Sequence, residues 1–361
     1  MFCVTHEDVA GILRDYGIAA ELRNVIELQR YDYEREDPDS KEVRLIVKLE
    51  FADAPSLVLR FKNEEDVTLD LLECQCAFAH ELKRHGILTP SQHQANGRFA
   101  NPYTIGGYEV FVTLEQFVEG EVKLIDPQIA KKIGELLGRS HRITEEYDLH
   151  VDNDVLFDPF TDNDLFDFEG FLSVEPLVQG EAKLLFDQIV ATYHSYMDLL
   201  APLRKRRKYA VQGDISNCNL YLSPCGEVGV FDFNRAGDNV LFCDAVMQGI
   251  FEAKLMDYPE DREEDFEAKI LSSFWAGYCS VRSLTAEERK LYPYLHAIIH
   301  AFWTADIRWS ENSLLNAYEA KDETRVHKWL STIWDRLTHA DILTHNMDLS
   351  DVLEICYLGE Q

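Results

Sequence analysis

The segment from Val211 to Phe233 constrains the fold of this 361-residue chain more than any other stretch. Two short runs rich in Leu, Val, Tyr and Phe flank a Ser-Pro-Cys-Gly sequence, which is strong turn chemistry. This pattern predicts a β-hairpin with strands over residues 220–222 and 228–231. The turn would bring Asn219, just before the first strand, beside Asp232, just after the second.

Three polar side chains at this hairpin form a pattern that phosphoryl transfer uses. Asp214 opens the loop, Asn219 follows five residues later, and Asp232 ends the second strand. In such sites one Asp orients a hydroxyl and accepts its proton, while an Asn and a second Asp hold Mg2+ on the nucleotide phosphates. An ordinary acidic hairpin is the alternative, because Asp and Asn are also common turn residues.

The sequence Gln-Gly-Asp-Ile-Ser-Asn-Cys-Asn at 212–219, with Phe-Asp-Phe at 231–233, resembles the aminoglycoside phosphotransferase superfamily. That superfamily includes choline and ethanolamine kinases and type II homoserine kinases, and its usual signature is H-G-D-x-x-x-x-N followed by I-D-[FW]. The resemblance implies an α+β, bilobal, protein-kinase-like fold with a small antiparallel β-sheet N-lobe and a large, mainly helical C-lobe. It also implies ATP as the donor, Asp214 as catalytic base, and Asn219 and Asp232 as Mg2+ ligands.

Two residues depart from the superfamily's pattern. Gln212 replaces the usual His, which mostly braces the loop; an amide still donates and accepts hydrogen bonds. On the predicted helix 64–85, the family's glutamate, which pairs with a third-strand cation, falls on Gln75. Because a neutral amide cannot neutralise a cation, we name Glu73 as the candidate partner, with Glu81 as the other possibility.

The predicted third strand, residues 56–62, carries two cations on one face. Strand alternation places Arg60 and Lys62 together, opposite the apolar face. Both could reach the nucleotide phosphates. The resemblance to the family pattern V-L-[KR] points to Arg60, and Lys62 remains a competitor. A solvated edge charge is the alternative for each residue.

Local patterns before residue 117 predict a small sheet with two helices. The expected helices cover residues 7–16 and 64–85, and the expected strands cover 22–29, 42–50, 56–62 and 109–114. No glycine-rich loop joins the first two strands, so residues 31–40 are the candidate phosphate-covering loop.

The stretch from Glu115 to Gly120 resembles the superfamily's interlobe connector, in which the backbone of Gln116, Phe117 and Val118 would pair with adenine. We therefore expect an N-terminal nucleotide-binding lobe over residues 1–116. The C-terminal lobe would then cover residues 117–361 and carry the catalytic loop and the substrate site.

After the connector the chain has a mainly helical pattern. Asp126 and Pro127 give a clear helix start, and we expect helices over residues 126–142, 178–201, 263–279, 285–310, 313–320 and 324–337. Residues 148–176 form an acidic, aromatic insertion. Asp244 resembles the family residue that caps or braces the following helix, and we expect His141 to pack in the core.

Trp303, Asp306 and Trp309 lie at i, i+3 and i+6 on one predicted helix. Aromatic rings together with a carboxylate suit a cationic alcohol, so these three residues are candidate substrate contacts. A packed core is the alternative, because it commonly produces the same aromatic spacing.

The charge balance limits the partners: 35 basic against 65 acidic residues give a net charge of −30. Nucleic acid and anionic membranes are poor partners for such a surface, whereas a cationic small-molecule alcohol would be attracted. Seven acids and no base lie between Asp152 and Glu169, and seven acids with a single Arg lie between Asp257 and Glu267. For either acidic cluster alone we favour a solvated surface that promotes solubility. The eight cysteines lack C-x-x-C spacing and the N-terminal residues lack a signal-peptide pattern, so we expect free thiols and a cytoplasmic location.

These patterns predict an ATP-dependent phosphotransferase that acts on a small-molecule hydroxyl of the amino alcohol, homoserine or aminoglycoside type. Composition favours the cationic acceptors, whereas the frequency of homoserine kinases in the family favours homoserine. A nucleotide-binding pseudokinase with a regulatory role is the alternative, motivated by Gln212, Gln75 and the absence of a glycine-rich loop. A protein kinase is disfavoured because neither the A-P-E nor the H-R-D motif occurs. The oligomeric state is left open.

Overall fold

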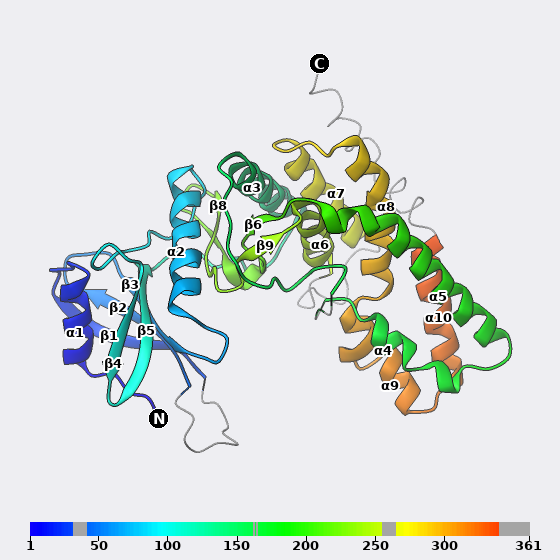
Figure 1. Cartoon of the computed structure of the whole chain (residues 1–361), viewed down its shortest axis with the longest axis horizontal. Helices are drawn as coiled ribbons and strands as arrows, with labels where there is room; N and C mark the ends of the chain where they lie inside the picture. The colour runs from blue at the N-terminus through cyan, green and yellow to red at the C-terminus, as the bar shows by residue number, and fades with distance from the viewer. Residues whose placement is uncertain (32–41, 162, 164, 255–264, 339–361) are drawn as a thin grey trace. The chain divides into compact units, whose positions relative to one another are not determined.

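The computed structural model describes residues 1–31, 42–161, 163, 165–254 and 265–338, and the chain divides into two compact units. Unit 1 comprises Met1–Val122, Leu149–Asn153 and Cys218–Gly237, and unit 2 comprises Lys123–Asp148, Asp154–Asn217 and Asp238–Gln361. Figure 1 labels the helices and strands of both. Asn219 and Asp232 therefore belong to unit 1, and Asp214 belongs to unit 2. The lobe division at residue 116 stays a prediction.

Unit 1 is built on a five-stranded antiparallel sheet in the order β1-β2-β3-β5-β4. Its strands are β1 (Leu22–Tyr31), β2 (Val43–Phe51), β3 (Leu57–Asn63), β4 (Ala100–Ile105) and β5 (Tyr108–Gln116). The register pairs Arg60 of β3 with Thr113 of β5. Because residues two apart on a strand share a face, Arg60 is the diagonal neighbour of Glu115.

Helix α1 (His6–Asp15) covers one face of this sheet (Figure 1). A capping box begins the helix: the Thr5 hydroxyl accepts from the Asp8 amide at 3.1 Å, and the Asp8 carboxylate accepts from the Thr5 amide at 2.8 Å. Apolar residues of α1 join one core cluster with alternate residues of β2, β3 and β5. That face is therefore packed, and the polar residues of β3 and β5 lie on the other face.

Helix α2 (Leu69–Arg84) borders the polar face. It begins after Thr68, whose Oγ1 accepts from the Leu71 amide at 3.1 Å, so it starts five residues later than predicted. Four of its residues line a narrow cleft together with Arg60, Thr113 and Glu115 of the sheet: Leu72, Gln75, Cys76 and Ala79. The polar face of the sheet thus forms one wall of a cleft and α2 forms another.

The predicted hairpin is confirmed, with β7 (Leu220–Leu222) antiparallel to β8 (Val228–Val230). Gly226 closes its turn at φ 78°, a conformation that glycine adopts without strain. The segment that follows β5 contacts this hairpin, since the Leu222 amide donates to the Gly120 carbonyl at 2.6 Å. A Cβ at Gly120 would lie 2.2 Å from the Leu222 carbonyl oxygen, so only glycine fits there.

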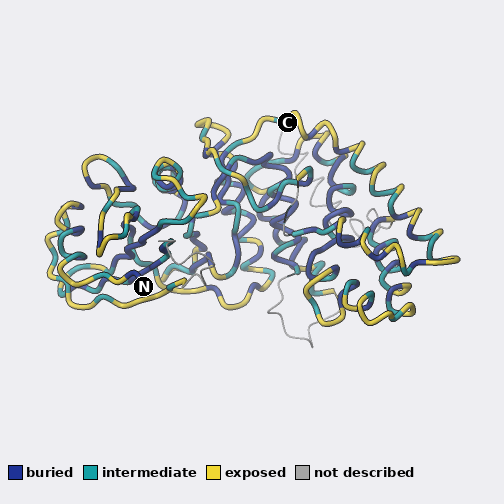
Figure 2. Tube along the Cα trace, turned by 60° about the horizontal axis from the view of Figure 1, so that its bottom comes forward, coloured by how far each residue is buried: buried dark blue, intermediate teal, exposed yellow. Residues whose placement is uncertain are grey.

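Unit 2 is mainly helical over the residues that the structure describes. Its helices are α3 (Pro127–Glu146), α4 (Phe168–Leu172), α5 (Glu181–Leu200), α6 (Leu241–Ala253), α7 (Phe266–Cys279), α8 (Ala286–Ala301), α9 (Leu314–Glu319) and α10 (Glu323–Thr338). Strand β6 (Tyr209–Val211) pairs with β9 (Gly237–Asn239) in a two-stranded sheet. Its core includes the fully buried side chains of Trp275, Tyr278 and Tyr292, and Figure 2 shows buried residues on the inner sides of the helices.

Helices α3 and α7 meet at backbone contact distance. A Cβ at Gly134 of α3 would lie 2.0 Å from the Phe274 carbonyl oxygen, and a Cβ at Gly277 of α7 would lie 1.9 Å from the Lys131 carbonyl oxygen. Only glycine therefore fits at these two positions. Because the two backbones lie this close, the side chain of His141 on α3 contacts that of Tyr278 on α7 directly.

Most predicted elements are confirmed, with shifts at their ends. The helix start at Asp126 is confirmed, since its Oδ1 accepts from the Ile129 amide at 2.7 Å. A single helix over 285–310 is wrong: α8 ends at Ala301, and a separate π-helical turn follows at Ala305–Trp309. Strand β4 was not predicted.

Two predicted features lie outside the described residues almost entirely. The candidate phosphate-covering loop at 31–40 is described only at Tyr31, and the acidic cluster near residue 260 only from Asp265 onward. No helix in the described part of the chain has both the length and the apolar character needed to cross a membrane.

Candidate active site

Arg60 stands at the centre of the cleft in unit 1. Its Nη2 and Nε donate to Glu115 Oε1 at 2.8 and 3.0 Å, and its Nη1 lies 3.5 Å from Asp232 Oδ2. Burial alone would lower the pKa of Arg60, but the attraction of Glu115 and Asp232 outweighs it, so the pKa is raised. The register of β3 and β5, together with the hairpin, thus gathers one buried cation between two carboxylates.

Asp232 has an unusual backbone for a residue with a side chain. Its φ is 57°, in the left-handed region, and its Oδ1 accepts from the Asn234 amide at 3.3 Å. Burial would raise its pKa, but Arg60 and Lys62 lower it. Asp232 is therefore an ionised carboxylate that faces the cleft from the end of the hairpin.

Lys62 is the second cation on this face. Its Nζ donates to Asn234 Oδ1, and its side chain is 5% exposed. Burial, reinforced by repulsion from Arg60, lowers the pKa of Lys62 to about 8. Gln75 of α2 contacts the same segment, since its Nε2 donates to the carbonyls of Asn234 and Ala236 at 2.9 and 3.3 Å. The neutral Gln75 thus holds the backbone after Asp232 and leaves Arg60 to another partner.

Asn219 is fixed by the hairpin that carries Asp232. The Phe231 amide donates to the Asn219 carbonyl at 2.9 Å, and Asn219 is 8% exposed. An amide oxygen and an ionised carboxylate are the hard oxygen donors that Mg2+ prefers. The chemistry of this pair therefore fits the ion that the resemblance implies.

Glu73, the expected partner of the third-strand cation, has other contacts. Its Oε2 accepts from the Ala100 amide at 2.8 Å and lies 4.0 Å from Arg98 Nε. In the structure the carboxylate beside Arg60 is Glu115, because β5 is paired directly with β3 whereas Glu73 points toward β4. The role of Glu73 in nucleotide binding stays a prediction.

The connector residues already use part of their backbone. The Gln116 amide donates to the Ser91 carbonyl at 2.9 Å, and the Phe117 amide donates to the Ser56 carbonyl at 3.0 Å. The Phe117 ring lies under Lys48, with Nζ 4.4 Å from its centroid. The amides of Gln116 and Phe117 thus already have partners, and the pairing of this segment with adenine stays a prediction.

In unit 2, Gln212 braces the loop that carries Asp214. The Gln212 Oε1 accepts from the Asp214 amide at 2.8 Å, and Gly213 between them has φ 79°. Gln212 is 5% exposed, so this hydrogen bond is shielded from water. The amide thus makes a loop-bracing contact in the place where the superfamily usually has His.

A second set of neutral contacts holds the next residue of the loop. Gln248 of α6 donates from Nε2 both to the Ile215 carbonyl and to Glu252 Oε1, the latter at 2.6 Å. Glu252 has no exposed surface, and burial raises its pKa to about 8. Its carboxyl is accordingly protonated at neutral pH, which makes this chain of contacts uncharged.

A small pocket in unit 2 opens beside Asp214. Its lining combines two acids, Asp214 and Asp244, two amides, Asn239 and Gln248, and apolar residues: Val155, Leu156, Phe157, Leu165, Ile215, Met247 and Phe251. Its polar groups and apolar wall are of the kinds that line small-molecule sites, but its volume of about 30 Å³ is well below the roughly 300–1,000 Å³ of most ligand pockets. These acids and rings are compatible with a cationic ligand.

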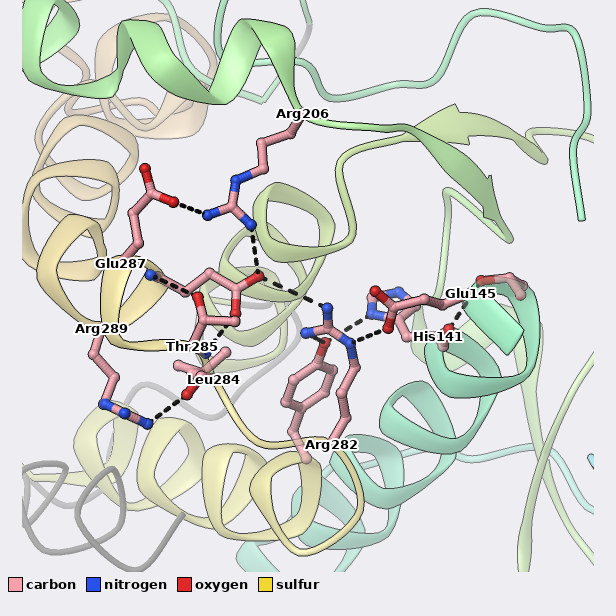
Figure 3. A network of polar contacts seen from close by, with 11 residues as sticks. His141, Glu145, Arg206, Arg282, Leu284, Thr285, Glu287 and Arg289 are labelled. Atoms are coloured by element: carbon pink, nitrogen blue, oxygen red, sulfur yellow. Dashed lines mark hydrogen bonds and ion pairs between the residues drawn. The ribbon is translucent and has the colours of Figure 1, made fainter. Parts of the chain in front are cut away.

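Asp244 is held by a buried hydrogen-bond network. His141, labelled in Figure 3, lies between Asp244 and Tyr278, with its Nε2 3.0 Å from Asp244 Oδ2 and its Nδ1 2.9 Å from Tyr278 Oη. Burial lowers the pKa of His141 although Asp244 opposes the shift. His141 is packed in the core as predicted, since it has no exposed surface.

The network continues from Tyr278 to the surface through alternating charges. Arg282 donates to Tyr278 Oη at 3.3 Å and lies 3.4 Å from Glu145 and 3.7 Å from Glu288. Arg206 in turn pairs with Glu287 (Figure 3). The basic stretch at residues 204–208, before the loop that carries Asp214, therefore has at least one structural contact, with α8.

The three candidate substrate contacts after α8 do not share one surface. Trp303 is 7% exposed and Trp309 is 57% exposed. Asp306 is held by Arg336 at 2.8 Å and lies 3.8 Å from Lys254. The end of α8 and the π-helical turn separate the rings, and two cations neutralise the carboxylate. Their role in substrate binding stays a prediction.

A cavity of about 420 Å³ in unit 2 lies in the acidic, aromatic insertion. Its walls include Phe168, which stacks on Tyr193 of α5, and Arg204, whose guanidinium lies 4.2 Å from the Phe160 centroid. Asp167 faces this cavity but pairs with Arg308 at 2.8 Å. The insertion is thus a folded aromatic layer and not merely a solvated loop.

Sequence reasoning missed Glu115, Gln248 and Glu252. Glu115 lay inside a strand that was predicted one residue too short to include it. The spacing of Gln248 and Glu252, four residues apart, is that of neighbours on a helix face and could have indicated their contact. Nothing local could have shown that Gln248 reaches the catalytic loop.

No protein-family model and no curated protein sequence matches the chain. Solved structures do match in fold. An amicoumacin kinase, in complex with AMP-PNP, Ca2+ and Ami, is 13% identical with a TM-score of 0.54, covering 92% of this chain and 96% of that one. A microcompartment-associated aminopropanol kinase is 16% identical with a TM-score of 0.51, covering 96% and 98%.

An aminoglycoside phosphotransferase from Alicyclobacillus acidocaldarius is 11% identical with a TM-score of 0.51, covering 94% of this chain and 98% of that one. At these identities the likeness concerns the fold. The predicted α+β fold, with a small antiparallel sheet and a large helical part as in these phosphotransferases, is confirmed.

Proposed function

We propose that the chain is an ATP-dependent phosphotransferase that moves the γ-phosphate to a hydroxyl of a small molecule. The observation that carries the proposal is the cleft in unit 1, where Arg60 and Lys62 lie beside the ionised Asp232. Two buried cations suit a polyphosphate, and a carboxylate at the end of the hairpin suits its metal ion. The fold shared with an amicoumacin kinase and an aminopropanol kinase supports the same activity.

In this proposal Asn219 and Asp232 hold the Mg2+ of the nucleotide. When bound, the ion neutralises charge that develops on the phosphate oxygens. Arg60 supplies hydrogen-bond donors in a planar fork that matches phosphate geometry, and Lys62 supplies a compact second charge. Adenine would pair with backbone groups of the segment Gln116–Val118.

Asp214 would orient the acceptor hydroxyl and take its proton. The contact from Gln212 fixes the backbone at Asp214, and Gln248 fixes the carbonyl of Ile215. Asp214 lies five residues before Asn219 in the chain, which is the spacing of the superfamily signature. Positioning of this kind supplies much of the catalysis of phosphoryl transfer, because the loose transition state requires little covalent help from the protein.

The acceptor class that the pocket favours is an amino alcohol. A hydroxyl at Asp214 and an ammonium group at Asp244 would each meet a carboxylate, while Phe157, Met247 and Phe251 offer an apolar wall. The net charge of −30 acts in the same direction, because it raises the local concentration of cations.

A pseudokinase is the second candidate, and Gln75 is the observation that favours it. Kinases of this superfamily usually have a glutamate there, whereas Gln75 donates to two backbone carbonyls. The pseudokinase hypothesis predicts nucleotide binding without transfer to any alcohol.

An ADP-release assay over amino alcohols, aminoglycosides, homoserine and sugars, with ATP and Mg2+, separates the candidates. We expect turnover with at least one amino alcohol. Asp214→Asn should lower kcat by about 10³-fold while nucleotide affinity stays unchanged, since acid–base groups contribute about 10²- to 10⁴-fold.

Asp198→Asn is the matched control, because Asp198 is exposed at the end of α5. Equal kcat in the Asp214 and Asp198 variants would reject the role of Asp214. Nucleotide binding without ADP release for any acceptor would favour the pseudokinase.

A further inference from the structure

We infer that Glu115 is the positioning residue for the nucleotide-binding Arg60, in place of a glutamate on helix α2. This inference rests on the proposed function, because it assigns Arg60 to the phosphates. We infer no direct contact between Glu115 and the nucleotide. It acts by fixing which edge of the guanidinium faces the cleft.

The geometry divides the donors of Arg60 into two sets. A guanidinium has five N–H donors, and Glu115 Oε1 takes one from Nε and one from Nη2 at 3.0 and 2.8 Å. The Nη1 end points toward Asp232, at 3.5 Å. The remaining donors are thus presented on the side of the cleft where the proposed metal ligand lies.

Glu115 is itself held in place. Its second oxygen, Oε2, accepts from Gln92 Nε2 at 2.8 Å, and its side chain is 11% exposed. Both carboxylate oxygens therefore have partners, one to Arg60 and one to Gln92. A buried carboxylate with this geometry has little freedom to leave Arg60.

The placement of Glu115 has a consequence for regulation. In an arrangement with a helix glutamate, the ion pair forms only when the helix is close to the sheet. Here the pair joins two strands, β3 and β5, that are hydrogen-bonded to each other. Glu73 of α2 is occupied by the Ala100 amide and Arg98, and Gln75 holds carbonyls after Asp232. The ion pair between Arg60 and Glu115 therefore forms independently of the position of α2. Movement of this helix does not make or break that ion pair.

The test is a double-mutant cycle on the full chain, with the Kd for AMP-PNP and Mg2+ measured by calorimetry. Glu115→Gln should raise this Kd about tenfold or more, because it removes a charge-assisted contact that orients Arg60. In an Arg60→Gln background the same change at Glu115 should have an effect within about twofold, since residues that act through one another are not additive. With an acceptor present, the KM for ATP should rise while the KM for the acceptor does not.

Two further variants complete the cycle. Glu109→Gln is the matched control, being the same substitution at an exposed position of β5. Glu73→Gln tests the competing helix partner and should weaken binding less than Glu115→Gln. If Glu115→Gln does not fold, as judged by circular dichroism, Glu115→Asp keeps the charge on a shorter side chain and should give a smaller increase in Kd that also vanishes without Arg60.

Each outcome decides the inference. Unchanged affinity in Glu115→Gln, an equal loss in both Arg60 backgrounds, or a larger loss in Glu73→Gln would overturn it while leaving the proposed function standing. Failure of the unmodified chain to bind AMP-PNP would overturn the proposed function and this inference together.

Discussion

The cleft of unit 1 and the loop of unit 2 that carries Asp214 are held by opposite means. In the cleft, ionised groups hold one another: Arg60 lies between Glu115 and Asp232. At the loop, neutral groups hold the backbone: Gln212 accepts from the Asp214 amide, and Gln248 donates to the Ile215 carbonyl. Arg60 and Glu115 in the cleft and Gln212 and Gln248 at the loop are all buried, so these holding groups differ in chemistry and not in exposure.

The contrast has a physical reason under the proposed function. A group that binds phosphate must stay charged when buried, and only counter-charges can hold it so. A carboxylate that receives a hydroxyl proton works best without a fixed cation competing for it. Neutral amides position the backbone around Asp214 without adding such a cation.

The largest expected effect tests the charged region. Arg60→Met should lower the free energy of unfolding by about 3–5 kcal/mol, because it leaves the buried Glu115 carboxylate without its partner. Urea unfolding measures this. Arg60→Met combined with Glu115→Met should recover much of the loss, since an apolar pair requires no ion to be desolvated. A double variant as unstable as the single one would contradict a buried ion pair.

The next largest effect tests whether Glu252, which accepts from Gln248 next to the loop, is uncharged, by measuring stability as a function of pH. Burial raises the pKa of Glu252 from 4.5 to about 8, so the folded state holds a proton that the unfolded state releases. Its contribution to stability is full below pH 4.5 and is lost as pH rises to about 8. Glu252→Gln should remove this part of the pH dependence and be the more stable protein at pH 9, by on the order of a few kcal/mol. Parallel pH profiles for the two proteins would show that Glu252 is ionised in the fold.

A smaller effect is expected from a single neutral contact. Gln212→Ala should lower the free energy of unfolding by about 1 kcal/mol, the usual value of one buried hydrogen bond, and should lower kcat more than nucleotide affinity. Gln212→His, which introduces the residue usual in the signature that this loop resembles, should retain most of the activity. Loss of activity in the His variant and not in the Ala variant would show that the amide does not brace the loop.

The smallest effect is expected at the aromatic residue after α8. Trp309→Ala should change the KM for the acceptor by less than about twofold, because exposed residues away from a site seldom matter. Trp309 is 57% exposed, and the carboxylate near it, Asp306, is paired with Arg336. A large rise in KM would restore the aromatic strip as a substrate site.

Local sequence signals predicted the parts of this molecule that local chemistry decides. The helix start at Asp126 and Pro127 and the β7–β8 hairpin follow from capping and turn residues and are confirmed. Strand alternation also placed Arg60 and Lys62 on one face, and both line or border the same cleft.

The parts that depend on register or on distant packing could not be predicted. Glu115 reaches Arg60 only because the register pairs Arg60 with Thr113. Gln248 reaches Ile215 from 33 residues away. The prediction of one helix over 285–310 was wrong because α8 ends at Ala301 and a π-helical turn follows at Ala305–Trp309. The spacing of apolar residues in the sequence does not indicate such a turn.

The glycine contact between α3 and α7 also bears on how this protein tolerates change. Gly134 and Gly277 have no space for a methyl group, and the helices they join carry His141 and Tyr278, which support Asp244. An alanine at either position would push the two helices apart and displace the residues that support Asp244. Under the proposed function, we expect changes of substrate preference to arise in the lining of the pocket, while the glycine contact between α3 and α7 stays unchanged.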